Sequence, residues 1–369
     1  MSALVLHEFH KNLNARMGDV HGMDVVMDYG SPLAEHAALR HSAGILDLSY
    51  RGRICLTGAD RVRFLHGQVT NDIKALREGC GCYAALVTAK GKMESDLNVY
   101  CLTDELLLDF EPGLTEPVSR RLEKYIVADD VQVVDVAPHY GLLSVQGPKV
   151  EPILRRLAVS GGFPSKPFDF VRIADTVFGE LYLMNRPRLG SEGVDVFAPI
   201  ASLRAVASAL VDAAKVAGGC ACGWQAFEVA RIEAGIPRFG VDMDESNIPL
   251  ECGIEAQAVS YRKGCYVGQE TINRIHSIGH VNRELRGLRL EAELKDLPAK
   301  GDKLFHSGKE AGYVTSAVSS PSLGSPIALG YVRREVNGIG TELTLRVTGG
   351  ESIARVTELP FVKQGSISP

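Results

Sequence analysis

The chain has 369 residues, of which 45% are hydrophobic and 23% charged, and its formal net charge is −5. A single hydrophobic core rarely supports a chain of this length, so we expect an ordinary globular protein of two or three packed units. Because the chain is slightly acidic, no global basic field draws it to nucleic acid or to an acidic membrane, and any anion site must be local.

The N-terminal sequence MSALVLHEFHKNLNARMG has no apolar core of a signal peptide. No uncharged apolar run reaches the length of about 18 residues that a membrane span needs. These features predict a cytoplasmic protein that does not enter a membrane. Eight cysteines spread over such a chain favour free thiols over disulfides.

The predicted elements of the first half are, in chain order, a helix over 31–44, a helix beginning near 57–60, a hairpin of strands 97–102 and 106–110, a helix from Thr115 and a strand over 131–136. Ser31-Pro32 is a typical helix start, and Gly44 is expected to end that helix. The second half repeats the alternation with a strand over 142–147, a helix from Pro148, a strand over 180–184 and a helix from Ala201. Strands mixed with helices without regular βαβ spacing indicate an α+β fold.

The sequence changes character from about Arg286. Short strands alternate there with Ser-Gly, Asn-Gly and Gly-Gly turns. This pattern predicts a small antiparallel barrel or sandwich at the C-terminal end.

A first candidate site lies in the segment KGKMESDLNVY, which contains Glu94, Asp96 and Asn98. In an alternating strand these three side chains share one face, and a carboxylate there could bind ring nitrogens or assist proton transfer. The alternative is a solvated hairpin face, which the spacing alone favours because antiparallel sheets usually place polar residues outward.

Two further candidates are weaker when taken alone. Glu192 lies in a Gly-Ser-Glu-Gly turn that lets a ligand approach closely. Arg231 lies three residues after Glu228 in FEVARIEAG and could bind a carboxylate ligand, although such a helical pair is more often a surface ion pair.

The segment 261–289 combines a local excess of cations with the motif RKGCYVGQE around Cys265. The cations could receive a polyanion such as RNA or form a solvated rim, and the two alternatives are even. For the cysteine, flanking cations and a following helix would raise the thiolate fraction, whereas most cysteines are inert core residues. The Cys-x-Cys pairs at 80–82 and 220–222 lack the spacing of zinc or iron–sulfur ligands, so no metal site is predicted. Nucleotide-binding glycine motifs are also missing from the sequence.

Several long segments together resemble a known family. They are YGSPLAEHAALRHSAGILDLSYRGRICLTGADRVRFLHGQVTNDI, LSVQGPK, RIEAGIPRFGVDMDESNIPLE and LGYVRRE. The chain is similar over nearly its whole length to the folate-dependent aminomethyltransferase superfamily, which includes the glycine cleavage T-protein. Within it, YRKGCYVGQE and GHVNRELRGL resemble the YgfZ-type folate-binding proteins that support iron–sulfur cluster assembly or repair.

The resemblance implies a three-domain fold around a central folate pocket. It places an N-terminal α+β folate-binding unit at 1–140, a second α+β unit with the cysteine motif at 141–285, and an antiparallel β-barrel at 286–369.

The same resemblance assigns roles to individual residues. It implies that Asp96 contacts the pterin and assists one-carbon transfer, that Tyr83 is a pocket aromatic, and that Glu192 and Arg231 bind the folate. The chain departs from the T-protein pattern at Ser95, where an aspartate is usual, and at Leu189, where an aromatic residue is expected.

Three hypotheses follow. The leading one is a YgfZ-like protein that binds tetrahydrofolate or a one-carbon derivative and acts with iron–sulfur assembly proteins or their client enzymes through Cys265. The runner-up is an aminomethyltransferase that uses Asp96 and a lipoyl carrier protein. The third is a folate-gated scaffold that binds RNA or another protein. Whether the chain catalyses any transfer stays open at this point.

Overall fold

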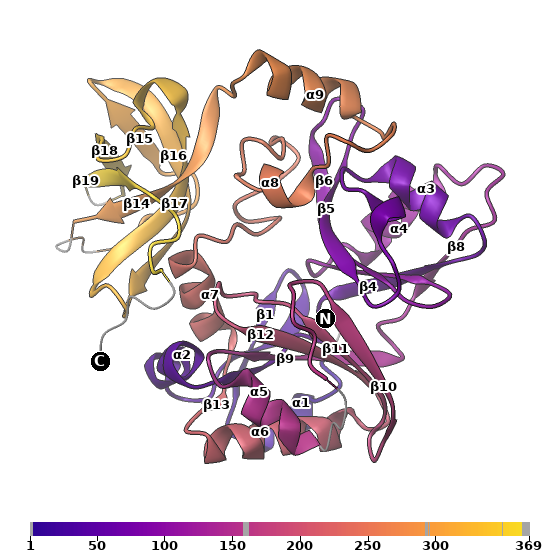
Figure 1. The fold of residues 1–369 in the computed structure, drawn as a ribbon. Coiled ribbons are helices and arrows are strands. Elements are labelled where there is room, and N and C mark those ends of the chain that lie inside the picture. Colours follow the sequence, from indigo (N-terminus) through magenta and orange to yellow (C-terminus); the bar gives the residue numbers. More distant parts are fainter. Residues whose placement is uncertain (1–2, 158–161, 292–293, 295, 349, 364–369) are drawn as a thin grey trace. The chain divides into compact units, whose positions relative to one another are not determined.

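The computed structural model describes residues 3–157, 162–291, 294, 296–348 and 350–363 (Figure 1). The chain forms two compact units. The first consists of Met1–Leu86, Ser95–Phe227 and Arg262–Tyr266, and the second of Val87–Glu94, Glu228–Tyr261 and Val267–Pro369. Within the described part of the chain, no helix is long and apolar enough to cross a membrane.

The first unit contains a six-stranded sheet in the order β10-β11-β12-β9-β3-β13. Its strands are β3 (Gly44–Asp47), β9 (Tyr140–Gln146), β10 (Phe170–Thr176), β11 (Gly179–Asn185), β12 (Gly193–Pro199) and β13 (Cys220–Ala221). Four helices precede or follow these strands along the chain: α1 (His7–Asn12), α2 (Pro32–His41), α5 (Val150–Leu154) and α6 (Leu203–Val216). Leu203, Val206 and Leu210 of α6 are fully buried in the core that the sheet and α5 share. The apolar face predicted for a helix from Ala201 is therefore the face of α6 that packs against the sheet.

A second sheet of the first unit has five strands in the order β5-β6-β7-β4-β8. They are β4 (Gly52–Thr57), β5 (Gly81–Val87), β6 (Met93–Cys101), β7 (Leu106–Phe110) and β8 (Gln132–Asp135). Helices α3 (Arg61–Gln68) and α4 (Thr115–Glu123) supply Phe64, Leu65, Val118 and Leu122 to its core. A separate hairpin pairs β1 (Arg16–Val20) with β2 (Met23–Asp28).

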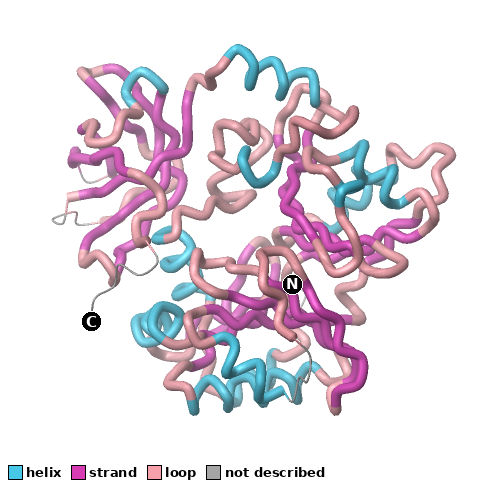
Figure 2. The backbone as a smooth tube through the Cα atoms, in the orientation of Figure 1, coloured by secondary structure: helices cyan, strands magenta, loops and turns pink. Residues whose placement is uncertain are grey.

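The second unit contains a closed antiparallel barrel in the order β14-β17-β16-β15-β18-β19. Its strands are β14 (Arg283–Leu290), β15 (Lys303–His306), β16 (Lys309–Ser320), β17 (Ser325–Arg333), β18 (Glu342–Val347) and β19 (Gly350–Thr357). Figure 2 shows the predominance of strands in this part of the chain. Helices α8 (Glu255–Ala258) and α9 (Gln269–Ile278) precede the barrel, and α7 (Trp224–Glu233) runs from the first unit into the second.

The structure confirms the α+β class, the predicted hairpin and the C-terminal β unit. In the hairpin, β6 and β7 pair with Asn98 opposite Asp109. The β unit is a barrel, because β14 pairs with both β17 and β19 and so closes the sheet. The prediction that Gly44 ends a helix is wrong, since α2 ends at His41 and Gly44 begins β3. A side chain at Gly44 would overlap Leu39 and Cys222, so the glycine serves close packing.

Gly312 in β16 should be intolerant of any side chain. A Cβ at this position would overlap the carbonyl oxygen of Tyr331 on the neighbouring strand β17. We expect Gly312→Ala to lower the free energy of unfolding by roughly 1–3 kcal/mol, because a backbone group must move to relieve the overlap. Thermal unfolding followed by circular dichroism measures the change. Gly338→Ala is the matched control, since its Cβ would meet Thr341 Oγ1 at 3.5 Å in ordinary contact. Equal effects of the two substitutions would contradict the account.

Candidate functional site

Asp96 lies on β6, and the described residues give a hydrogen bond to only one of its two carboxylate oxygens. The hydroxyl of Tyr83, on β5, donates a hydrogen bond to Asp96 Oδ2 at 2.8 Å. Asp96 Oδ1 is buried and has no hydrogen-bond partner among the described residues. A buried carboxylate oxygen without a donor is costly, so this atom is suited to accept a hydrogen bond from a ligand.

The surroundings of Asp96 bring its titration close to neutral pH. Burial raises the pKa of Asp96 to about 6, the negative charge of Glu111 adds to the rise, and the Tyr83 hydrogen bond and Arg51 oppose it. A carboxyl with such a pKa is largely ionised at pH 7.5 and can still take up a proton. These are the properties of a general base that works near neutral pH.

The face of β6 that carries Asp96 is only partly solvated, because Glu94 and Asp96 are partly buried and Asn98 is buried. Asn98, two residues further along the strand, is 3% exposed and donates to Asp109 Oδ2 at 2.7 Å. Arg186 donates to Asn98 Oδ1 at 3.1 Å. The polar face of the strand is thus packed against other polar groups of the first unit.

A buried network of charges surrounds Asp109 on β7. Arg51 Nε donates to Asp109 Oδ1, and Arg188 Nη2 donates to both Asp109 Oδ2 and Asp195 Oδ2, each at 2.7 Å. Both aspartates have no exposed surface. Burial alone would raise the pKa of Asp109, but Arg51 and Arg188 hold it far below its ordinary value. Through Arg51, which also pairs with Glu111, this network is coupled to the charge of Asp96.

Sequence reasoning missed this network because Asp109 is 58 residues from Arg51 and 79 residues from Arg188. One signal was present. Asp109 in LLLDF and Asp195 in GVDVF interrupt apolar strands, and a carboxylate in a buried strand requires a cation or several donors.

Glu192 lies just before β12 and its side chain is exposed. Its carbonyl oxygen accepts a hydrogen bond from Gly147 N at 2.8 Å, and its carboxylate makes no hydrogen bond or ion pair with the residues that the structure describes. Leu189, earlier in the same turn, is 1% exposed. The structure therefore brings Tyr83 and Asp96 together, and it leaves Glu192 as a separate exposed carboxylate.

Arg231 on α7 forms a buried ion-pair cluster in the second unit. Its guanidinium is 2% exposed, donates to Glu228 Oε2 at 2.9 Å and also pairs with Asp242. Asp242 in turn accepts hydrogen bonds from Thr315 at 2.6 Å and Ser316 at 2.7 Å. The expected surface ion pair is thus wrong, because Arg231 is buried, Glu228 is partly buried, and Arg231 is tied through Asp242 to the barrel strand β16.

Cys265 is an exposed free thiol, whereas the other seven cysteines are buried or partly buried free thiols. The preceding cation, Lys263, is not displayed at the surface. It is 7% exposed, and its Nζ donates to the carbonyl oxygens of His66, Val69 at 2.6 Å and Asn71 at 2.9 Å. Burial lowers the pKa of Lys263 to about 8. Lys263 therefore fixes the cysteine segment to the first unit.

Of the six cations of segment 261–289, three are engaged within the protein, while Arg262, Arg274 and Arg289 are exposed. Lys263 is buried, Arg283 pairs with Glu251, and Arg286 pairs with Glu284. Cations that are already paired contribute little attraction for a phosphate backbone. The three engaged cations therefore add nothing to the RNA-binding alternative.

Two protein domain families match the chain in succession. The GCVT N-terminal domain matches residues 6–263, and the glycine cleavage T-protein C-terminal barrel domain matches residues 283–363. The aminomethyltransferase of Bacillus subtilis (strain 168) is 29% identical over 97% of this chain and 98% of the relative. The aminomethyltransferase of Streptomyces avermitilis is 30% identical over 97% of both chains.

A solved structure of similar fold is the glycine cleavage system aminomethyltransferase T from Bartonella henselae. It has a TM-score of 0.89 and 25% sequence identity, and the match covers 98% of both chains. The predicted T-protein fold is confirmed. The relatives carry the name of the runner-up activity, aminomethyl transfer, so the order of the first two hypotheses is reversed.

Proposed function

Because the chain belongs to the glycine cleavage T-protein family, we propose that it transfers a one-carbon unit to tetrahydrofolate from an aminomethyl group on a lipoyl carrier protein, with release of ammonia. The observation that carries the proposal is the carboxylate of Asp96, which has one oxygen fixed by Tyr83 and one buried oxygen without a partner among the described residues.

The residues around Asp96 fit the pterin of a folate, which this family uses. A pterin presents amino and ring N–H donors and an aromatic surface. Asp96 Oδ1 supplies a buried acceptor for those donors, and Tyr83 supplies an aromatic ring that is 8% exposed. Small-molecule sites typically combine aromatic or apolar surface with a few precisely placed polar groups.

The chemistry at Asp96 consists of orientation and proton transfer. Tetrahydrofolate supplies the nucleophilic nitrogens that receive the one-carbon unit. Tyr83 holds Oδ2 and so fixes the carboxylate plane, while Oδ1 is left to accept a hydrogen bond or a proton. Most of the acceleration would come from positioning, with proton transfer contributing about 10²–10⁴-fold.

The other predicted site residues stay proposals. Glu192 is available as an exposed carboxylate. For Arg231 we propose a positioning role, because its guanidinium is fixed by the buried Asp242 and in turn holds Glu228, which is 19% exposed and can meet a ligand. The cytoplasmic location predicted from the sequence also remains a proposal.

Calorimetric titration with tetrahydrofolate tests the proposed pocket. We expect saturable binding by the full chain, and weaker binding of p-aminobenzoylglutamate, which lacks the pterin that Asp96 is proposed to bind. If tetrahydrofolate does not bind, or if both ligands bind equally tightly, the proposed role of Asp96 is wrong.

A second candidate function, the YgfZ-type role in iron–sulfur cluster assembly or repair, has one supporting observation. Cys265 is exposed on a segment that Lys263 anchors through backbone carbonyls. An exposed thiol on a fixed backbone is accessible to a metal cluster or to a partner protein. Under this candidate, Cys265→Ser should fail to restore iron–sulfur enzyme activity in cells that lack the protein, whereas Cys80→Ser should restore it. Full restoration by Cys265→Ser would exclude the thiol role.

Limiting iodoacetamide should label Cys265 ahead of the other seven cysteines. The reason is access, since Cys265 is exposed while burial raises the pKa of thiols such as Cys252 to about 12 and Cys82 to about 12. Peptide mass spectrometry after short exposure at pH 7.5 measures the order of labelling. Preferential labelling of Cys80 or Cys101 instead would show that the segment around Cys265 is covered in solution.

A further inference from the structure

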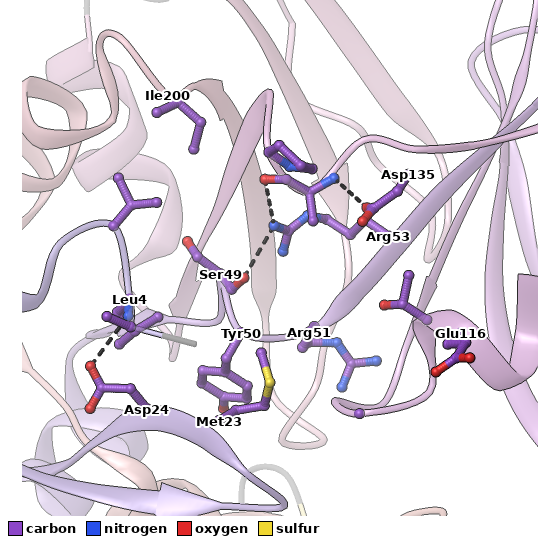
Figure 3. A pocket seen from close by; sticks show the side chains of 16 residues that line it. Leu4, Met23, Asp24, Ser49, Tyr50, Arg51, Arg53, Glu116, Asp135 and Ile200 are labelled. Atoms are coloured by element: carbon purple, nitrogen blue, oxygen red, sulfur yellow. Dashed lines mark hydrogen bonds between the residues drawn. The ribbon is translucent and has the colours of Figure 1, made fainter. Parts of the chain in front are cut away.

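A cavity of about 480 Å³ lies in the first unit, and Asp96 is not among the residues that line it. Its walls come from the N-terminal segment, the β1–β2 hairpin, the residues before and in β4, the start of α4 and the loop after β8 (Figure 3). Leu4, Met23, Tyr50 and Ile200 contribute apolar surface to it. The proposed aminomethyl transfer makes no use of this cavity.

Arg53 lines the cavity with an incompletely paired guanidinium. The residue is 1% exposed, and its Nη2 donates to the carbonyl oxygens of Ser49 at 3.1 Å and Ala137 at 3.4 Å (Figure 3). Its Nε and Nη1 atoms are buried and have no hydrogen-bond partner among the described residues. Burial lowers the pKa of Arg53 to about 10. A buried cation with unmet donors is unfavourable unless an anion joins it.

The carboxylates near Arg53 are engaged elsewhere. Asp109 is held by Arg51 and Arg188, and Asp47 is held by His10 at 2.8 Å and by Ser49 N at 2.9 Å. Asp24 accepts from Leu4 N at 3.2 Å and from His7. Asp135 accepts from Ala137 N at 3.0 Å. The protein therefore provides apolar walls and a buried cation whose carboxylate partner has to come from outside.

We propose that this cavity binds a small monocarboxylate, whose carboxylate pairs with Arg53 and whose short apolar chain lies against Leu4, Tyr50 and Ile200. Guanidinium groups form strong paired hydrogen bonds with carboxylates. Asp24, Glu116 and Asp135 also line the cavity, and its second cation, Arg51, is already paired with Asp109 and Glu111, so a second negative charge on the ligand would be repelled. This selects a monocarboxylate over phosphate or a dicarboxylate.

Butyrate, succinate and butylamine are matched probes for this site on the full chain. Calorimetry should show that butyrate binds, that succinate binds more weakly and that butylamine does not bind. Arg53→Met should weaken butyrate binding about tenfold or more, because a charge-assisted hydrogen bond is lost. Arg204→Met, which removes an exposed arginine of the same unit, is the control and should leave butyrate binding unchanged.

A second variant keeps the test decisive if Arg53→Met does not fold. Ala137 is partly buried and lines the cavity, and its backbone groups make the contacts described above. Ala137→Met should narrow the cavity beside Arg53 and weaken butyrate binding while Arg53 is retained. The proposal is overturned if wild type does not bind butyrate, if succinate or butylamine binds as well as butyrate, or if either cavity variant binds it as tightly as wild type.

Discussion

Replacing Asp96 with asparagine should lower the rate of folate-dependent aminomethyl transfer about 10²–10⁴-fold, the usual contribution of a positioned general base. Asparagine keeps the size of the side chain and can still accept the Tyr83 hydrogen bond, but it cannot take up a proton at Oδ1. The rate of ammonia release from an aminomethylated lipoyl carrier measures the loss. A rate within about threefold of wild type would remove Asp96 from the mechanism that we propose.

The same residue should set the acid limb of the pH–rate profile. The pKa of Asp96 is about 6, raised first by burial and then by Glu111. The active form is the carboxylate, so the wild-type rate should fall as the pH drops through about 6, and Asp96→Asn should lack this limb. Tyr83→Phe removes a hydrogen bond that lowers the pKa, so its limb should move to higher pH. A limb that moves to lower pH, or does not move, would contradict this assignment.

Stability should change in the opposite direction from activity. A carboxyl whose folded pKa is raised gives a stabilising contribution that is complete below its ordinary pKa and is lost as the pH rises through about 6. At pH 8 the ionised Asp96 is therefore a cost to the fold, and Asp96→Asn should raise the free energy of unfolding by about 1–3 kcal/mol. Urea unfolding at pH 8 and pH 5 should show the gain shrinking at the lower pH.

Replacing Asp109 with asparagine should lower the free energy of unfolding by about 3–5 kcal/mol, the cost of leaving buried charges without their partner. Arg51 and Arg188 both donate to this carboxylate, and all three residues are buried. Urea unfolding at pH 7.5 measures the change.

The matched control for Asp109→Asn is Glu116→Gln, which breaks an exposed ion pair with Arg120 and should cost less than about 1 kcal/mol. Because the pKa of Asp109 is depressed, its stabilising contribution is present above the ordinary carboxyl pKa and is lost only as the pH falls through the depressed value. Similar losses for the two variants would show that the buried network contributes little.

The sequence predicted those parts of the fold that depend on local patterns. The polar turn between the apolar segments 97–102 and 106–110 predicted the hairpin. The spacing of Leu203, Val206 and Leu210 predicted a helix, and the glycine turns after Arg286 predicted the β unit. Gly44 was predicted to end a helix because it follows a helical pattern. Its close contact with Cys222, which is distant in sequence, could not be seen from that pattern. A local sequence pattern indicates helices, strands and turns. It does not indicate which distant side chain packs beside a glycine.

The candidate site was predictable only in part for the same reason. The residue types of Tyr83 and Asp96 were recognised from the family resemblance, and their hydrogen bond emerged from the pairing of β5 with β6. The choice between a solvated and a buried face for Asn98 depended on Asp109 and Arg186, which lie on other elements. The lysine of the cysteine motif was expected beside the thiol, and it is instead held by carbonyl oxygens nearly 200 residues earlier in the chain.

Ammonia release by the wild-type chain is the most direct test of the proposed function. An aminomethylated lipoyl carrier protein is incubated with the chain, with and without tetrahydrofolate, and both ammonia and methylenetetrahydrofolate are measured. We expect equal amounts of the two products, formed rapidly only when tetrahydrofolate is present. Saturable tetrahydrofolate binding without any formation of methylenetetrahydrofolate would contradict it.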